Sequence, residues 1–189
     1  MSFFTCVFCA GEEPPSTDDD PSLQARLSNN PDRTAEEAEI DGVYGLCGEW
    51  KVAEVQGLDE FLEYKGASGA ERKMSAKASA NMFQTIRYDC ASKWSILTTV
   101  RPTQFVSKTT EVHFEIGVDF EGSLPDGSKF TALATVDGTT LSVTQTEANG
   151  AAVVISRQVL PDGRLLMTQS IPGCDPPVVV RRWFGRLAV

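Results

Sequence analysis

The sequence predicts an all-β fold, a ten-stranded antiparallel up-and-down β-barrel with a helix-turn-helix lid between strands one and two. Three observations predict it. Turn dipeptides recur at nearly regular intervals, apolar and polar residues alternate between them, and one early stretch shows helical spacing instead. A meander with two distinct faces and no covering helices must protect its edge strands, and closure into a barrel is the usual solution.

The turn dipeptides are Asp126-Gly127, Asp137-Gly138, Asn149-Gly150 and Asp162-Gly163, followed by Pro172-Gly173. The first four are spaced by 11, 12 and 13 residues. An Asp-Gly or Asn-Gly pair favours a tight type I′ hairpin turn, in which both central residues need positive φ. Each interval leaves room for one strand of about eight or nine residues.

Alternation with period two supports these strands. The apolar positions Leu141, Val143, Val153, Ile155 and Val159 are set against Ser142, Thr144, Ser156 and Gln158. Side chains on a strand point alternately to opposite faces, so one face of each strand is predicted to be buried. Earlier strands are predicted at 50–55, 82–88, 94–100, 110–116 and 120–123, which gives about ten strands in all.

Residues 58–80 interrupt the strand pattern. Leu58, Phe61 and Leu62 lie at helical spacing, and Gly66 ends the run. A second helix is predicted at 70–80, which is rich in Ala, Lys and Met. The two helices are too short to form a layer of their own, so we expect them to cover one end of the barrel, with the three apolar side chains facing the cavity.

The composition predicts one domain with an appendage. The chain has 189 residues, of which 41% are hydrophobic, enough for one core. Residues 12–39 are dominated by Glu, Asp, Pro, Ser and Asn and contain little that could be buried. We therefore predict a disordered acidic arm at 1–44 and a barrel domain at 45–189. A short helix is predicted at 34–40, where Thr34 and Glu37 can form a capping box.

Charge and cysteine content exclude several function classes. A net charge of -9 argues against nucleic acid and anionic membrane surfaces as partners, because both attract clustered Lys and Arg. No apolar run reaches the ~20 residues that a transmembrane helix needs. The five cysteines are an odd number and widely spaced, and no basic segment precedes the apolar amino terminus. We expect a cytoplasmic monomer without metal or cofactor.

Three sequence blocks resemble one known family. They are Gly48-Glu49-Trp50-Lys51-Val52 with Gly57-Leu58-Asp59-Glu60-Phe61-Leu62, the run at 110–121 (TEVHFEIGVDFE), and the pair Ile155-Ser156-Arg157 and Arg182-Trp183-Phe184. Their order and spacing resemble the intracellular lipid-binding proteins, the fatty-acid-binding-protein-like members of the calycin superfamily. Glu49 and Leu58 depart from that family's pattern. The resemblance covers nearly all of the chain beyond residue 45, and the arm has no counterpart in the family.

The resemblance implies a hydrophobic ligand held inside the barrel by its carboxylate. Arg157 shares the parity of Val153 and Ile155, so it points where they point, and a buried guanidinium suits a carboxylate. Alternation leaves Arg181 and Arg182 undecided on the last strand, and the resemblance selects Arg182 and Phe184. The family usually has Tyr at the position of Phe184, which cannot donate a hydrogen bond. The ligand-binding candidates are Arg157, Arg182, Phe184, Leu58, Phe61, Leu62, Phe105, Ile155 and Met167.

The expected function is binding and transport of a hydrophobic small molecule, with a long-chain fatty acid as the first choice. Another apolar ligand, such as a retinoid, sterol, bile pigment or carotenoid-derived chromophore, is an alternative. A scaffold or complex subunit that keeps the barrel and binds a protein partner through its arm is a second alternative.

Other chemistry has little support in the sequence. The single histidine, His113, has no nucleophile or carboxylate placed to form a triad, so no enzyme is expected. Cys6 and Cys9 lack the second pair that a zinc site needs. They are candidates for S-acylation and membrane contact because apolar residues flank them, and the competing interpretation is an apolar tail that packs on protein.

Overall fold

The computed structural model describes residues 43–89, 92–103, 105–123, 128–148 and 150–188. The predicted arm up to residue 42, with its helix at 34–40 and with Cys6 and Cys9, lies outside the described residues. The predicted turn at Asp126-Gly127 and the Asn149 position of the predicted Asn149-Gly150 turn do too.

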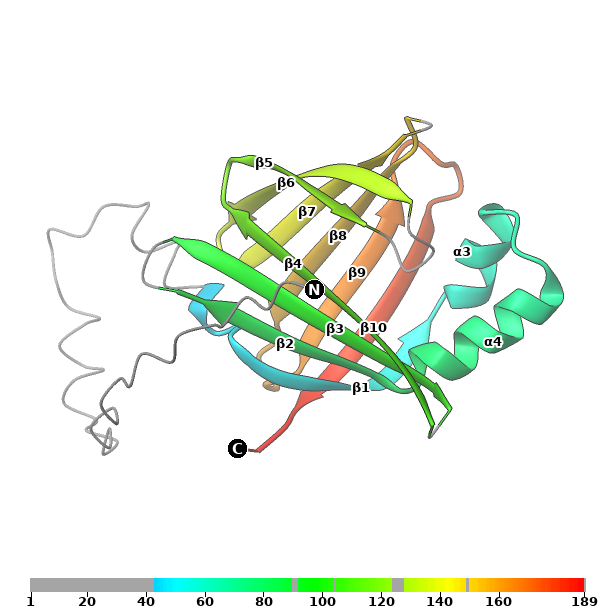
Figure 1. The fold of residues 1–189 in the computed structure, drawn as a ribbon, viewed down its shortest axis with the longest axis horizontal. Helices are drawn as coiled ribbons and strands as arrows, with labels where there is room; N and C mark the ends of the chain where they lie inside the picture. Colours follow the sequence, from blue (N-terminus) through cyan, green and yellow to red (C-terminus); the bar gives the residue numbers. More distant parts are fainter. Residues whose placement is uncertain (1–42, 90–91, 104, 124–127, 149, 189) are drawn as a thin grey trace, which may run out of the picture. The chain divides into compact units, whose positions relative to one another are not determined.

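Ten antiparallel strands form one nearly closed barrel (Figure 1). They are β1 (Gly48–Gln56), β2 (Met82–Tyr88), β3 (Lys93–Thr103), β4 (Val106–Glu115), β5 (Asp119–Ser123), β6 (Lys129–Asp137), β7 (Thr140–Glu147), β8 (Ala152–Val159), β9 (Leu165–Ile171) and β10 (Val178–Arg186). Neighbours in sequence pair with each other, and β1 also pairs with β10. The ladder stops at β4 and β5, which end the sheet. The predicted up-and-down barrel is confirmed.

Two helices lie between β1 and β2, as predicted, at one end of the barrel (Figure 1). They are α3 (Leu58–Tyr64) and α4 (Gly69–Ser79). Ser68 and Glu71 form a capping box at the start of α4, which satisfies backbone N–H groups that have no partner within the helix. Lys65 Nζ lies 2.7 Å from Glu147 Oε1, so the end of α3 is tied to the end of β7.

The two hairpin turns at Gly138 and Gly163 use glycine as predicted, but they are not type I′ turns. Gly138 has φ 56 between the paired residues Asp137 and Thr140, and neither Asp137 nor Thr139 has positive φ. Positive φ at the first central residue alone is the requirement of a type II′ turn. In the β8–β9 hairpin, Leu160 N donates to Arg164 O, which leaves a three-residue loop with Gly163 at φ 80. The longer loop needs positive φ only at its last residue, so Asp162 keeps ordinary backbone geometry.

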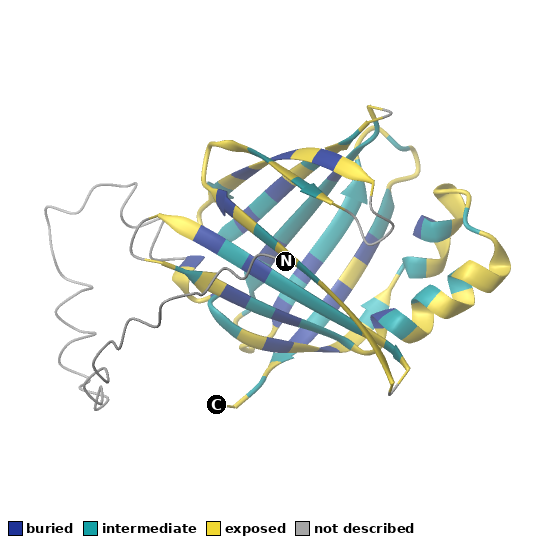
Figure 2. Ribbon diagram, viewed as in Figure 1, coloured by how far each residue is buried: buried dark blue, intermediate teal, exposed yellow. Residues whose placement is uncertain are grey.

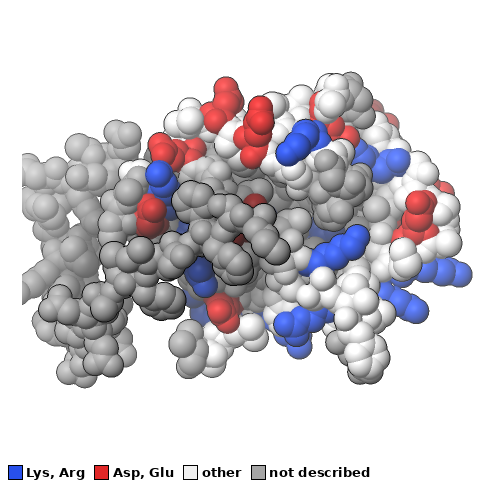
Figure 3. Space-filling view, in the orientation of Figure 1, with Lys and Arg blue, Asp and Glu red and all other residues white. Residues whose placement is uncertain are grey.

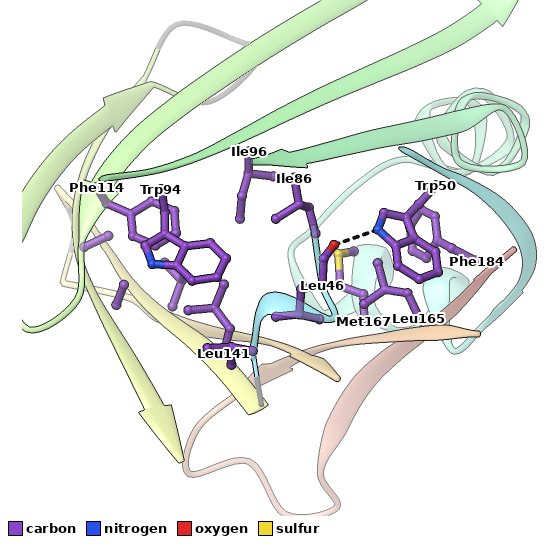
Figure 4. Close-up of a cluster of buried hydrophobic side chains, with 14 of the residues drawn as sticks. Leu46, Trp50, Ile86, Trp94, Ile96, Phe114, Leu141, Leu165, Met167 and Phe184 are labelled. Carbon is purple, nitrogen blue, oxygen red and sulfur yellow. Dashed lines mark hydrogen bonds between the residues drawn. The ribbon is translucent and has the colours of Figure 1, made fainter. Parts of the chain in front are cut away.

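The barrel interior holds the main hydrophobic cluster, and burial alternates along the strands (Figure 2). Trp50, Leu46, Leu165, Met167 and Phe184 lie close together in it, and the Trp50 indole N–H donates to the Leu46 carbonyl at 2.8 Å (Figure 4). Trp94, Phe114 and Leu141 lie in another part of the same cluster (Figure 4).

The core begins two residues before the predicted boundary at residue 45. Val43 is fully buried, and the Tyr44 ring packs edge-on against Tyr88 with 5.0 Å between ring centroids. The composition of the preceding segment did not predict this, because one apolar residue hardly changes the composition of a polar stretch.

Candidate ligand-binding site

Two arginines are buried inside the barrel, one on either side of Met167. Met167 of β9 is paired with Arg157 of β8 and with Arg182 of β10. Arg157 and Arg182 are 6% and 5% exposed, whereas Arg181 is exposed. The structure thus settles the register that alternation left open. Neighbouring strands lie about 4.8 Å apart, so the two arginine backbones are separated by about 10 Å across β9.

Arg157 of β8 is hydrogen-bonded to a glutamine of β2, a strand that is not a neighbour of β8 in the sheet. Its Nε donates to Gln84 Oε1 of β2 at 3.2 Å. The Gln84 amide nitrogen donates in turn to Thr98 Oγ1 of β3 at 3.2 Å and approaches Met167 Sδ at 3.6 Å. Gln84 is 2% exposed and therefore connects β2, β3, β8 and β9 inside the barrel.

Arg182 has a separate set of partners. Its Nε donates to Ser79 Oγ at 3.0 Å, and its Nη1 donates to Gln169 Oε1 at 3.2 Å. Ser79 is the last residue of α4 and is 4% exposed. The lid therefore reaches the interior cation directly.

Among the described residues, both guanidiniums have neutral hydrogen-bond partners only. Within the described part of the chain, no carboxylate oxygen lies within 4.0 Å of Arg157 or Arg182. Burial lowers the pKa of Arg157 to about 10, with a further contribution from the charge of Arg182, and burial lowers the pKa of Arg182 to about 10. Both side chains stay protonated at neutral pH. A buried cation without a counter-ion is costly, and an anionic ligand relieves that cost.

The remaining candidates fall into three groups. Met167, Phe184 and the half-buried Ile155 lie in the interior beside the arginines. Phe61 of α3 is 5% exposed and forms a second cluster with Val153 and Val180, on which Leu58 packs. Leu62 is half-buried. Phe105 is 87% exposed next to the β3–β4 turn, so it does not line the interior.

Phe105 lies instead on a small surface cavity of about 240 Å³, together with Arg101, Val106 and Ser107. Phe105 was predicted to be a ligand-binding residue, and the structure places its side chain in solvent beside the β3–β4 turn instead. Any role of Phe105 in binding would be at the outside of the barrel.

Sequence reasoning missed Ser79, Gln84 and Gln169. Gln84 and Gln169 share the inward parity of their strands, so two polar residues at inward-facing strand positions were the available signal. Ser79 gave no such signal, because its partner lies 103 residues away.

The outer surface carries the other charges. In Figure 3 most of the visible Lys and Arg side chains lie towards the lid end, and many of the Asp and Glu side chains lie away from it. The His113 side chain is 68% exposed, and its Nε2 lies 3.6 Å from Glu111 Oε1. The described residues contain no group of three His, Cys, Asp or Glu that could hold a metal ion. No described helix has the length and apolar character needed to cross a membrane.

No family model matches the chain. Several curated proteins match it, two of them over 122 residues each. Sodium/calcium exchanger regulatory protein 1 of Doryteuthis pealeii is 30% identical, over 65% of this chain and 84% of that protein. The adipocyte fatty acid-binding protein of Pygoscelis papua is 29% identical, over 65% of this chain and 85% of that protein.

The chain is also similar to solved protein structures. The REP1-NXSQ fatty acid transporter superposes with a TM-score of 0.63 and 26% identity, over 77% of this chain and 98% of that one. A fatty acid binding protein of Schistosoma mansoni, solved with arachidonic acid, shares the fold with a TM-score of 0.64 and 22% identity, over 78% of this chain and 99% of that one. On its sequence relatives and its ten-stranded barrel, the chain belongs to the fatty-acid-binding protein family.

Proposed function

We propose that this protein binds and carries a hydrophobic carboxylic acid, a long-chain fatty acid, inside its barrel. The observation that carries the proposal is the pair of buried guanidiniums with no carboxylate of the described chain beside either of them. A fatty acid offers one anion for these cations and an apolar tail for the surrounding walls.

The chemistry of the walls supports this ligand class. Met167, Phe184 and Ile155 offer apolar surface next to the cations. Burial of the apolar tail stabilises the complex by about 25 cal/mol for each Å² of apolar surface removed from water. The guanidiniums select the acid over neutral molecules of the same length. Names of relatives point the same way, since three of those described above are fatty-acid carriers or binders by name.

The test is native mass spectrometry of protein isolated without delipidation, followed by titration of the delipidated protein with palmitic acid and hexadecanol. We expect a bound mass in the fatty-acid range and a clear preference for the acid. Equal affinity for the acid and the alcohol would contradict a carboxylate site, and a bound sterol, retinoid or pigment would replace the fatty acid as the ligand.

A binding and transport role needs no catalysis, and we propose none. We also propose a cytoplasmic location and a monomeric barrel domain preceded by an acidic arm. Free thiols at Cys47 and Cys174 support a reducing compartment.

A second candidate is regulation of a membrane transport protein. The relative at 30% identity is named as a regulatory protein of a sodium/calcium exchanger. Regulation would require that the transport protein bind this barrel. Reconstituted exchange activity measured with delipidated and fatty-acid-loaded protein would test it, and an effect that is the same for both forms would separate regulation from ligand binding.

A further inference from the structure

Ser79 stands out among the buried polar residues because it comes from the lid and touches the interior cation. It ends α4, and apart from Ser79 the described residues of that helix are exposed or half-buried. Its Oγ lies 3.0 Å from Arg182 Nε. The guanidinium nitrogen can only donate, so the serine oxygen is the acceptor in this bond.

A hydroxyl that accepts in this way still has its own proton to donate. In the described part of the chain, the only hydrogen bond of the Ser79 side chain is the one from Arg182. Nε and Nη1 of Arg182 are used by Ser79 and Gln169, which fix the plane of the guanidinium, while Nη2 has no described acceptor. One proton of Ser79 and the protons of Nη2 are therefore available side by side at a buried position.

The aromatic residue on the same face of β10 cannot donate a hydrogen bond beside Arg182. Phe184 is fully buried two positions along from Arg182, and its ring has no donor. Of the described hydroxyl groups, Ser79 is the one hydrogen-bonded to a buried guanidinium. Gln84 and Gln169 accept from the arginines through their amide oxygens. The Gln84 amide N–H groups face Thr98 Oγ1 and Met167 Sδ, and the Gln169 amide N–H groups are a second neutral donor near Arg182.

We propose that Ser79 is a ligand-binding residue whose hydroxyl donates to the ligand carboxylate held by Arg182. This inference rests on the proposed function. Because Ser79 belongs to α4, the carboxylate then forms a bridge from β10 to the lid. Binding of an acid should hold α4 in place, whereas a neutral ligand of the same length leaves the lid as free as in the unloaded protein.

The test uses the full chain, delipidated, with palmitic acid and hexadecanol as matched ligands. We expect Ser79→Ala to weaken palmitic acid binding by about tenfold, which corresponds to about 1.4 kcal/mol, and to leave hexadecanol binding unchanged. Ser79→Thr keeps a hydroxyl and should retain most of the acid affinity. Ser75→Ala, one turn earlier on the same helix, is the control and should change neither affinity.

Two further measurements separate binding from a purely structural role. Phe184→Tyr added to Ser79→Ala supplies a phenol on the same face and should restore acid binding. If that double variant does not fold, the comparison of Ser79→Ala with Ser79→Thr still tests whether the hydroxyl group contributes to acid binding. Hydrogen–deuterium exchange of residues 69–79 should be slowed by palmitic acid more than by hexadecanol, and this difference should vanish in Ser79→Ala.

Different outcomes would contradict the role of Ser79 and the proposed function. Acid binding by the parent protein that Ser79→Ala leaves intact, or acid and alcohol affinities that fall equally, would overturn the role of Ser79 while the proposed function stands. A parent protein that does not prefer the acid would overturn the proposed function itself.

Discussion

Arg157 and Gln84 are joined across the barrel interior by a hydrogen bond of 3.2 Å, although 73 residues separate them in sequence. The bond links β8 to β2 and leaves the guanidinium with a neutral partner. A neutral amide orients the cation without cancelling its charge. Arg157 therefore keeps its attraction for an anion.

The first prediction concerns that charge. Arg157→Gln should weaken fatty-acid binding by about 1–3 kcal/mol, the range for a hydrogen bond to a charged group, and should affect the matching alcohol much less. Fluorescence displacement titrations with both ligands measure the difference. The free energy of unfolding of the unloaded protein should not fall together with the affinity, because the substitution also removes a buried cation. Equal losses for the acid and the alcohol would show that Arg157 is structural.

The second prediction concerns the junction of β1 and α3. Gly57 has φ 72, and a Cβ atom there would overlap the Val179 carbonyl oxygen. Gly57→Ala should lower the free energy of unfolding through both backbone strain and this overlap. Gly66→Ala is the control, because Gly66 has φ 80 with nothing within 4 Å of the added atom. It should cost only the backbone term of about 1–2 kcal/mol, and urea denaturation should show a larger loss for Gly57→Ala.

Much of the barrel was predictable because its signals are local. The predicted strand at 82–88 has the bounds of β2, since alternation and the neighbouring breaks in the pattern all lie within a few residues. β3 was predicted too short. It continues through Arg101 and Pro102 to Thr103, where the pairing with β4 shifts register between Val100 and Thr103. A strand that tolerates proline at an irregular pairing cannot be recognised from propensity alone.

The binding site was predictable only in part. The parity of Arg157 with Val153 and Ile155 gave its inward direction, because strand periodicity fixes the face of every residue at once. The partners of the arginines are a matter of tertiary contact. Ser79 meets Arg182 only after the lid folds over the barrel end, so no spacing in the sequence marks it as part of the site.

The third prediction concerns the boundary of the barrel. A fragment of residues 43–189 should have a free energy of unfolding about 1.5–3 kcal/mol higher than one of residues 45–189, because only the longer fragment buries Val43. Both fragments should bind a fluorescent fatty-acid analogue as tightly as the whole chain. A large loss of affinity in both would mean that the residues before Val43 contribute to uptake or to the ligand site.

The last prediction concerns the lid. Phe61 is buried in a cluster with Val153 and Val180 that is separate from the main core around Trp50. A carboxylate cannot remain in that cluster without a high desolvation cost, so α3 should move outward in Phe61→Glu. The main core keeps its contacts, and we therefore expect fatty-acid affinity to fall by about tenfold or more while the melting temperature changes less than in a Trp50→Ala variant. Tyr64→Glu, at an exposed position of the same helix, should leave affinity near that of the parent. If thermal unfolding of Phe61→Glu shifts strongly before any loss of affinity is measurable, Phe61 is part of the folding core and the lid does not control uptake through this side chain.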